Sequence, residues 1–349
     1  MTPNPFLGAV LLSIGGCSSA LCYTPQKRVR AWSWQTYWLA QALVCWVILP
    51  WICAWITTPQ FLTVLQQAPT RIILNTTLLG ALFGVGGTAF GVAIRYIGFS
   101  LTYAIAIGIS CVLGTIFTPL LSGELAALLS RKGIGWVLGG IAVAAAGILI
   151  SGLAGWFKDI DLQNSGTMQG FQFGKGLSFC LLAGVLSAVF GISLDVGKPI
   201  ATIAAAHGAG QFEGNVVYIF ACGGAFVSTA IYCLFLHLRQ STLGEYLKLP
   251  PGAPPSTLPI NFSMAALTGL LWYSQFFVYG LGQVRMGEYK FTSWAIINAM
   301  LVFFSAIVGL AMREWKGCRP RTWATLSAAF LMLLVAVGLM TYGNYLGSA

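Results

Sequence analysis

A stripe of aromatic and amide side chains near residue 275 is the clearest candidate for chemistry in this sequence. Trp272, Gln275, Phe276, Tyr279 and Gln283 follow one another at helical spacing, so they share one face of a helix. An amide both donates and accepts hydrogen bonds, and an aromatic ring covers the apolar face of a sugar. The stripe therefore predicts a binding site for a polyhydroxylated solute. Hydrogen bonding between helices within an aromatic core explains the same residues equally well.

Two further apolar segments carry polar side chains on one face. Trp294 and Asn298 share a face in residues 292–312, and Trp34, Trp38 and Gln41 share a face in residues 34–56. We predict that Gln41, Trp294 and Asn298 belong to the solute site. For Trp34 and Trp38 the commoner role is in the aromatic belt at a membrane interface.

Few side chains could carry a proton. Glu124, Asp195 and Glu288 lie at the ends of apolar segments, and we predict Asp195 and Glu288 as proton-coupling groups. Plain ion pairs with the nearby Lys198 and Lys290 are the alternative. The other five acids lie in loops or among basic residues, where solvated roles are expected: Asp159, Asp161, Glu213, Glu245 and Glu314.

The sequence offers no arrangement typical of an enzyme or a metal site. It has no Ser–His–Asp constellation, no phosphate-binding glycine loop and no CxxC pair among its nine cysteines. His207 and His237 are far apart in the sequence. We therefore predict no catalytic residues, no metal site and no cofactor, and we interpret the cysteines as small apolar residues.

The elements that must position these residues are membrane-spanning helices. Hydrophobic residues make up 57% of the chain and charged residues only 7%, whereas a soluble domain has about 25% charged residues. A surface that faces lipid needs no charge. The net charge of +10 arises from Lys and Arg in short loops. This pattern indicates contact with anionic lipid head groups rather than with nucleic acid.

Ten segments approach the length of about 20 apolar residues that a helix needs to cross a bilayer. The third and fourth are separated only by Arg95 and Tyr96, which predicts a tight helical hairpin. No basic stretch precedes the first segment, so we expect it to be retained as a span. The predicted spans are Phe6–Cys22, Trp34–Ile56, Ile72–Ile94, Ile97–Leu121, Ile134–Leu153, Gly174–Val196, Val216–Leu236, Asn261–Gly282, Thr292–Met312 and Trp323–Tyr345.

The basic residues predict the orientation. Loops after the odd-numbered spans hold 12 of the 18 Lys and Arg residues, and the alternate loops hold 6. Because Lys and Arg are retained in the cytoplasm, the odd-numbered loops should be cytoplasmic. Both termini are then predicted to be periplasmic.

The two halves of the chain repeat one another weakly. The repeat predicts a first five-helix repeat at 1–155, a connecting loop at 156–173 and a second five-helix repeat at 174–349. Five is an odd number, so the second half is inverted relative to the first, with the solute near the membrane midplane between the halves. A shift of 189 residues aligns Gly80, Gly91 and Gly98 with Gly269, Gly280 and Gly287, and a shift of 168 aligns Gly16, Ser19 and Ala20 with Gly184, Ser187 and Ala188.

Several strings resemble the L-rhamnose–proton symporter family of the drug/metabolite transporter superfamily. The most specific are YTPQKRVRAWSW at Tyr23–Trp34 and GLLWYSQFFVYGLG at Gly269–Gly282. The resemblance covers nearly the whole chain. It implies ten spans, an inverted five-plus-five repeat and sugar uptake driven by protons. It also implies that the sugar site includes the residues of the second string that match in place, which are Trp272, Tyr273, Gln275 and Tyr279.

We therefore expect an all-α polytopic membrane protein of the bacterial inner membrane. Its predicted function is import of L-rhamnose or a related deoxy sugar by proton symport with alternating access. The nearest alternative is a transporter of another small polar metabolite, either uncoupled or driven by sodium. A membrane enzyme or a sensor would need paired catalytic groups or an appended soluble domain, and the sequence predicts neither.

Overall fold

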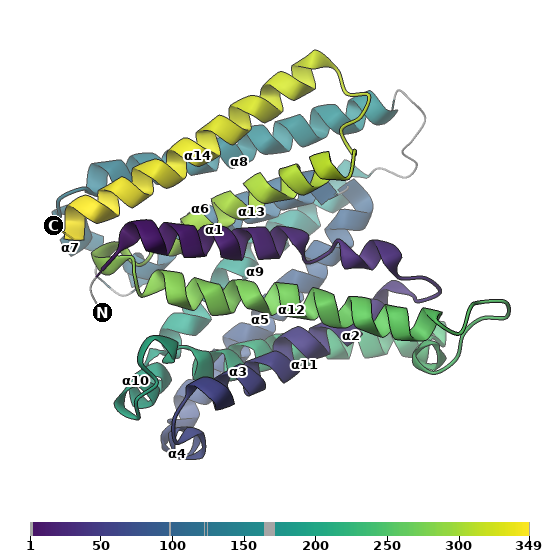
Figure 1. Ribbon diagram of the computed structural model, residues 1–349, viewed down its shortest axis with the longest axis horizontal. Helices are drawn as coiled ribbons and strands as arrows, with labels where there is room; N and C mark the ends of the chain where they lie inside the picture. Colours follow the sequence, from purple (N-terminus) through teal and green to yellow (C-terminus); the bar gives the residue numbers. More distant parts are fainter. Residues whose placement is uncertain (1–2, 98, 122, 124, 164–171, 349) are drawn as a thin grey trace. The chain divides into compact units, whose positions relative to one another are not determined.

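The computed structural model describes the chain except for residues 1–2, 98, 122, 124, 164–171 and 349. Within the described part, every regular element is a helix (Figure 1). The long helices are α1 (Pro5–Leu21), α5 (Thr70–Ile97), α6 (Phe99–Leu121), α8 (Ile134–Gln163), α9 (Phe173–Val196), α11 (Asn215–Gln240), α12 (Thr257–Gln283), α13 (Thr292–Ala311) and α14 (Pro320–Ser348).

The second predicted span is a composite helix. It consists of α2 (Trp34–Leu43), the π-helical turn η2 (Val44–Ile48) and α3 (Leu49–Thr57). Short helices connect the long ones. They are α4 (Phe61–Gln67), α7 (Leu125–Leu129), α10 (Lys198–Ala206), η1 (Pro25–Arg28), η3 (Gly210–Phe212), η4 (Leu243–Tyr246) and η5 (Gly287–Tyr289).

Each of the ten predicted spans falls on a helix, and eight of the described helices are long and apolar enough to cross a membrane. The chain is therefore an all-α, multi-pass membrane protein. Two helices are outside this group of eight. They are α6, which is an apolar helix of 23 residues, and α12, which carries the polar and aromatic residues of the stripe described above.

The fifth predicted span is longer than expected. Its helix, α8, continues past Leu153 to Gln163. Asp159 and Asp161 consequently lie on a helix and are buried, so the solvated role expected for them is wrong. Glu245 is not a freely solvated acid either. Its carboxylate accepts hydrogen bonds from the Ser33 N–H and from the Ser33 and Thr36 hydroxyls, at the start of α2.

The helices form two compact units. Unit 1 contains residues 1–20, 86–192 and 278–349, and unit 2 contains residues 21–85 and 193–277. Each unit combines segments from the first and second halves of the sequence. Helices α5, α9 and α12 contribute several residues to each unit, and α1 contributes its last residue, Leu21, to unit 2.

In unit 1, α8 and α14 pack side by side along their length (Figure 1). Glycines at seven-residue intervals on α8, beginning at Gly133 just before it, make this contact close. A Cβ on Gly133 would lie 2.3 Å from the Gly343 carbonyl oxygen, and one on Gly140 would lie 2.9 Å from the Met340 nitrogen. Small residues let helices approach in lipid, where dispersion contacts and hydrogen bonds drive association.

In unit 2, α5 and α11 are in backbone contact. A Cβ on Gly80 would lie 2.0 Å from the Ala221 carbonyl oxygen, and one on Gly224 would lie 1.9 Å from the Thr77 carbonyl oxygen. Gly80 and Gly84 are four residues apart on α5, which is the small-residue spacing typical of close membrane helix pairs.

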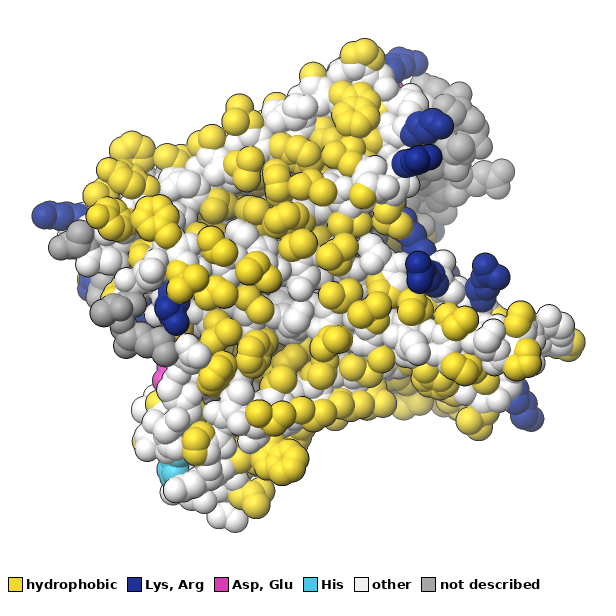
Figure 2. Space-filling model, in the orientation of Figure 1, with side chains coloured by type: hydrophobic (Ala, Val, Ile, Leu, Met, Phe, Trp, Pro, Cys, Tyr) yellow, Lys and Arg dark blue, Asp and Glu magenta, His cyan; other side chains and the backbone are white. Residues whose placement is uncertain are grey.

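The exterior is predominantly apolar, as a lipid-facing surface requires. Figure 2 shows a face covered by hydrophobic side chains, with Lys and Arg side chains at its margins. Large exposed hydrophobic residues such as Trp55, Leu149, Ile231 and Leu331 contribute to this surface.

Candidate functional site

The seven predicted solute-binding residues fall into two groups. Gln41, Trp272, Tyr273 and Gln275 belong to unit 2, whereas Tyr279, Trp294 and Asn298 belong to unit 1. The two groups differ in whether their polar atoms have hydrogen-bond partners within the protein.

In unit 2, a glycine brings α2 close to α12. A Cβ on Gly269 would lie 2.7 Å from the Val44 Cβ and 3.0 Å from the Gln41 carbonyl oxygen. Less than one turn further along α12, the Trp272 ring meets the Trp46 ring edge-on, with 5.2 Å between centroids. The Gln41–Trp46 segment and the Trp272 end of the stripe therefore line the same interior region.

The π-helical turn η2 has a local cause. Pro50 has no N–H, so it cannot donate the helical hydrogen bond to the carbonyl of Trp46, four residues earlier. A wide π turn at Val44–Ile48 accommodates this loss. Such turns are frequent at functional sites, and this one carries Trp46 into the buried interior.

Three buried polar atoms on this composite helix lack a hydrogen-bond partner among the described residues. They are the indole N–H of Trp38, the amide oxygen of Gln41 and the indole N–H of Trp46. The three side chains are only 3%, 2% and 2% exposed. An unpaired buried polar group costs about 1–3 kcal/mol. The hydroxyl groups of a bound solute can accept hydrogen bonds from the two indole N–H groups and donate one to the amide oxygen.

Aromatic rings surround these polar atoms. Trp38 is stacked between Tyr23 and Trp34, with centroid distances of 5.7 and 5.0 Å. Trp38 is therefore an interior residue of unit 2. Trp272 contacts Phe83 and Phe276 in addition to Trp46, so the region offers aromatic surface to the apolar face of a sugar.

The other two unit 2 residues are also buried. Tyr273 faces α11, because its ring meets that of Tyr218 at 6.2 Å, and its hydroxyl lies beside the Cys53 thiol. Gln275 is 8% exposed. Tyr273 thus packs toward a different neighbour from Trp272, which contacts η2.

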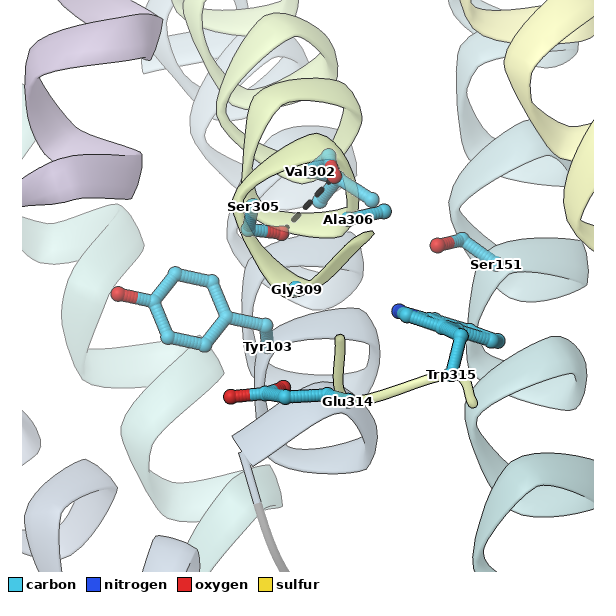
Figure 3. Close-up of a pocket in the computed structure, with 8 residues that line it drawn as sticks. All are labelled: Tyr103, Ser151, Val302, Ser305, Ala306, Gly309, Glu314 and Trp315. Atoms are coloured by element: carbon cyan, nitrogen blue, oxygen red, sulfur yellow. Dashed lines mark hydrogen bonds between the residues drawn. The ribbon is translucent and has the colours of Figure 1, made fainter. Parts of the chain in front are cut away.

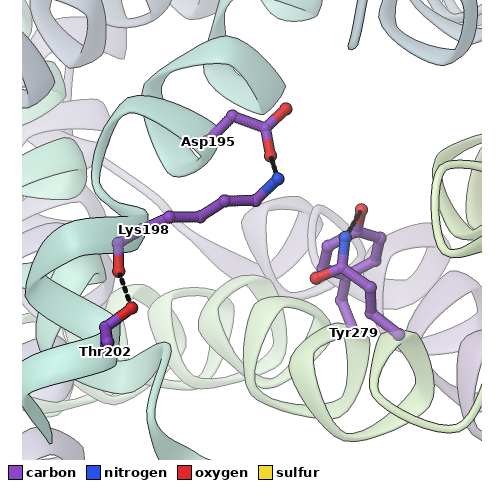
Figure 4. Close-up of polar contacts among 5 residues, drawn as sticks. Asp195, Lys198, Thr202 and Tyr279 are labelled. Carbon is purple, nitrogen blue, oxygen red and sulfur yellow. Dashed lines mark hydrogen bonds and ion pairs between the residues drawn. The ribbon is translucent and has the colours of Figure 1, made fainter. Parts of the chain in front are cut away.

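The unit 1 residues already have partners within the protein. The Trp294 indole N–H donates to the Ser110 carbonyl oxygen at 3.0 Å, and the Asn298 amide donates to the Trp294 carbonyl oxygen at 2.7 Å. The Tyr279 ring lies edge-on to that of Trp294, at 5.8 Å. The Gln283 amide donates to the Tyr279 hydroxyl at 3.2 Å (Figure 4). These contacts hold α12, α13 and α6 together within unit 1.

The two predicted coupling acids, Asp195 and Glu288, both lie near the ends of long helices. Asp195 forms an ion pair with Lys198, with 2.7 Å between Oδ1 and Nζ, and the Lys198 carbonyl accepts a hydrogen bond from Thr202 (Figure 4). The Asp195 side chain is 29% exposed. The backbone of Glu288 lies in η5, but its side chain is outside the described part of the structure.

The sequence pattern did not single out Trp46. A single tryptophan in an apolar run has no distinguishing periodicity. Two features together could have indicated it, because Trp46 follows Trp38 by two helical turns and precedes Pro50 by four residues. The second feature marks the carbonyl that the proline leaves unpaired.

Comparison with known proteins gives a match along nearly the whole chain. The family described as L-rhamnose-proton symport protein (RhaT) matches residues 1–345. The chain is 33% identical over 339 residues to the L-rhamnose-proton symporter of Cronobacter sakazakii (strain ATCC BAA-894), covering 97% of each chain. It is 32% identical over 340 residues to the proteins of the same name from Yersinia pestis (strain Pestoides F) and Yersinia pseudotuberculosis (strain IP32953), again covering 97% of each chain.

Proposed function

Because this chain belongs to the L-rhamnose-proton symport protein family, we propose that it is a secondary transporter that imports L-rhamnose or a related deoxy sugar together with protons, by alternating access. The observation that carries the proposal is the match to this family over residues 1–345. The family is one of transporters, not of enzymes.

The sugar site is assigned to unit 2. Its support is the set of open polar atoms on Trp38, Gln41 and Trp46, next to the aromatic surface of Trp272. Gln275 and Tyr273 complete the predicted group in this unit. Tyr279, Trp294 and Asn298 remain predicted contacts of the solute from unit 1, although in the described state their polar groups bond within the protein.

A panel of solutes tests this function. A ligand that binds only the folded protein raises its melting temperature. L-Rhamnose should give the largest rise among deoxy sugars, hexoses and amino acids added to the purified protein. A larger rise with an unrelated metabolite, and none with L-rhamnose, would contradict the proposed substrate.

Ten spans in an inverted five-plus-five repeat, with repeats at 1–155 and 174–349, are part of this proposal. Support comes from three pairs of helices at equivalent places in the two repeats that contact one another, α8 with α14, α6 with α13 and α3 with α11. Val137 on α8 approaches Gly343 on α14. Ser110 on α6 bonds Trp294 on α13. In unit 2, Thr57 of α3 bonds Asn215 of α11.

Contacts between helix ends support alternating sides for the loops. In unit 2, the segment after the first span bonds the segment after the seventh through Ser33 and Glu245. In unit 1, Asp161 after the fifth span pairs with Arg319 after the ninth. The Tyr289 hydroxyl, after the eighth span, bonds the Lys132 carbonyl, after the fourth. In these contacts, segments that follow odd-numbered spans bond to one another, and segments that follow even-numbered spans bond to one another.

The proposed setting is the bacterial inner membrane, with both termini periplasmic. The odd-numbered loops hold 12 of the 18 Lys and Arg residues and are assigned to the cytoplasm, next to anionic lipid head groups.

The side of Cys318 tests this orientation. In a variant that keeps Cys318 as its single cysteine, a membrane-impermeant maleimide should label inside-out vesicles but not intact cells. Burial raises the pKa of the Cys318 thiol, so the labelling needs an alkaline buffer to form the reactive thiolate. Strong labelling of intact cells would reverse the assigned orientation.

Asp195 and Glu288 remain the proton-coupling acids predicted from the sequence. Asp195→Asn and Glu288→Gln should each abolish sugar accumulation driven by a pH gradient, while exchange of sugar across the membrane continues. An amide cannot bind and release the proton, but it keeps the shape of the acid. Full accumulation by both variants would exclude these two residues as coupling groups.

A further inference from the structure

A buried group of charged residues lies at the C-terminal end of α8 in unit 1. Lys158, Asp159 and Asp161 are each less than a tenth exposed. Charged side chains buried within a membrane protein are costly, and they usually mark ion pathways or proton relays. The three residues have different surroundings, which separate a structural role from a functional one.

Asp161 has a structural role. Its Oδ2 accepts hydrogen bonds from the Arg319 backbone N–H at 2.9 Å and from the Thr322 hydroxyl at 2.6 Å. Its Oδ1 lies 3.5 Å from the Arg319 Nε. The carboxylate therefore holds the first turn of α14, where negative charge is favourable.

Lys158 forms the cationic centre of the group. Its Nζ lies 3.8 Å from the Glu314 Oε2 and 5.1 Å from the centre of the Trp315 ring. The Glu314 side chain is 33% exposed. An ion pair with this much contact to the surroundings can stay ionised at modest cost.

Asp159 is different from both neighbours. It is 6% exposed, and its Oδ2 has no hydrogen-bond partner among the described residues. The charged groups around it are Lys158 and Glu314, with Cys318 nearby. Helix α6, which packs on α8, has no charged residue. On α14, Arg321 covers the Phe157 ring, and Arg319 just before that helix's first turn pairs with Asp161.

We propose that Lys158, Asp159 and Glu314 form a proton-binding site, in which Asp159 takes up and releases a proton during transport. This inference rests on the proposed proton symport and adds a site to the two acids predicted from the sequence. One lysine faces two carboxyl groups. With both carboxylates ionised the buried group has a net charge of −1, and one proton on Asp159 neutralises it. An ionised carboxylate with a buried, unpaired oxygen is costly, whereas the protonated carboxyl is not.

A small polar pocket lies next to Glu314 of this group. It lies between α6, α8 and α13 of unit 1, and Glu314 and Trp315 form one side of it (Figure 3). Tyr103, Ser151 and Ser305 contribute to its lining. Its volume of about 20 Å³ is enough for one water molecule. A water there would contact Glu314, the ion-pair partner of Lys158.

The test compares Asp159→Asn with Asp161→Asn in proteoliposomes. Addition of L-rhamnose to the wild type should alkalinise the external medium, as a pH dye reports. Asp159→Asn should reduce this proton movement at least tenfold while keeping exchange of labelled L-rhamnose within about twofold. Asp161→Asn, which loses a helix contact, should lower the melting temperature and retain the proton movement. Exchange by Asp159→Asn also shows that the variant is folded.

Proton movement by Asp159→Asn equal to that of the wild type would overturn this inference and leave the proposed function intact. No proton movement in the wild type would overturn both. A second variant, Lys158→Met, does not depend on how Asp159→Asn folds. Removing the cation makes the ionised carboxylates less favourable, so proton movement should become half-maximal at a higher pH than in the wild type. An unchanged pH profile would contradict the proposed site.

Discussion

Replacement of Gln41 by leucine should weaken L-rhamnose binding about tenfold to a hundredfold, without lowering the melting temperature of the sugar-free protein. The loss corresponds to about 1–3 kcal/mol, the range for a hydrogen bond to a buried group whose partner is removed. The amide oxygen of Gln41 is buried without a hydrogen-bond partner in the described part of the chain. Leucine has a similar volume and removes this unpaired atom, so the sugar-free protein should be as stable as the wild type or more stable.

A glutamine that only connected helices would give the opposite result. Gln35, on the same helix, is the matched control, because it is buried and its amide donates to Gln240 and Thr242 at 3.0 and 2.9 Å. Gln35→Leu should lower the melting temperature and leave the dissociation constant for L-rhamnose nearly unchanged. Both quantities are measured on the same purified preparation. Unchanged affinity in Gln41→Leu would remove Gln41 from the sugar site.

Gly224→Ala should have the largest effect on stability, because the new Cβ meets backbone atoms. It would lie 1.9 Å from the Thr77 carbonyl oxygen and 2.8 Å from the Ala81 nitrogen, both on α5. A side chain could rotate away from such a clash, but a helix backbone must move as a unit. The cost should reach about 3 kcal/mol, the upper end for overpacked interiors. Most of the variant should aggregate on extraction into detergent.

The neighbouring Gly223 provides the control. A Cβ at this position meets no atom within 4 Å among the described residues beyond its chain neighbours and the nearby backbone of its own helix. Alanine has a higher helix propensity than glycine by about 1 kcal/mol, so Gly223→Ala should keep or raise the melting temperature. Size-exclusion profiles and melting temperatures of the two variants make the comparison. Equal behaviour of Gly223→Ala and Gly224→Ala would show that α5 and α11 are not in close contact.

Much of the fold could be predicted from the sequence, because a bilayer imposes one dominant requirement on each span. Apolar runs of sufficient length place all ten predicted segments on helices. Helix α12 is outside the group of eight helices that are long and apolar enough to cross a membrane, and it carries the polar and aromatic stripe that predicts a solute site.

The C-terminal end of α8 could not be predicted in the same way. Lys158, Asp159 and Asp161 interrupt the apolar run, and such residues usually mark a loop. The structure continues the helix because Asp161 contacts Arg319 and Thr322, and Lys158 contacts Glu314. These partners are more than 150 residues away in the sequence, so no local pattern reveals them.

The candidate site was predicted in part. Gln41 and Trp272 were identified by residue type and helical spacing, and they lie in the same unit. The sequence does not reveal which polar atoms lack a hydrogen-bond partner once the helices have packed. That distinction depends on tertiary contacts, as the bonded indole of Trp294 and the open indole of Trp46 illustrate.

The most direct test of the central claim is uptake of labelled L-rhamnose by proteoliposomes that contain only this protein. With a pH gradient, acidic outside, the sugar should accumulate above its external concentration, and a protonophore should abolish the accumulation. Uptake that never exceeds equilibrium, with or without the gradient, would contradict proton symport, and no uptake of L-rhamnose beyond that of empty liposomes would contradict the assigned substrate.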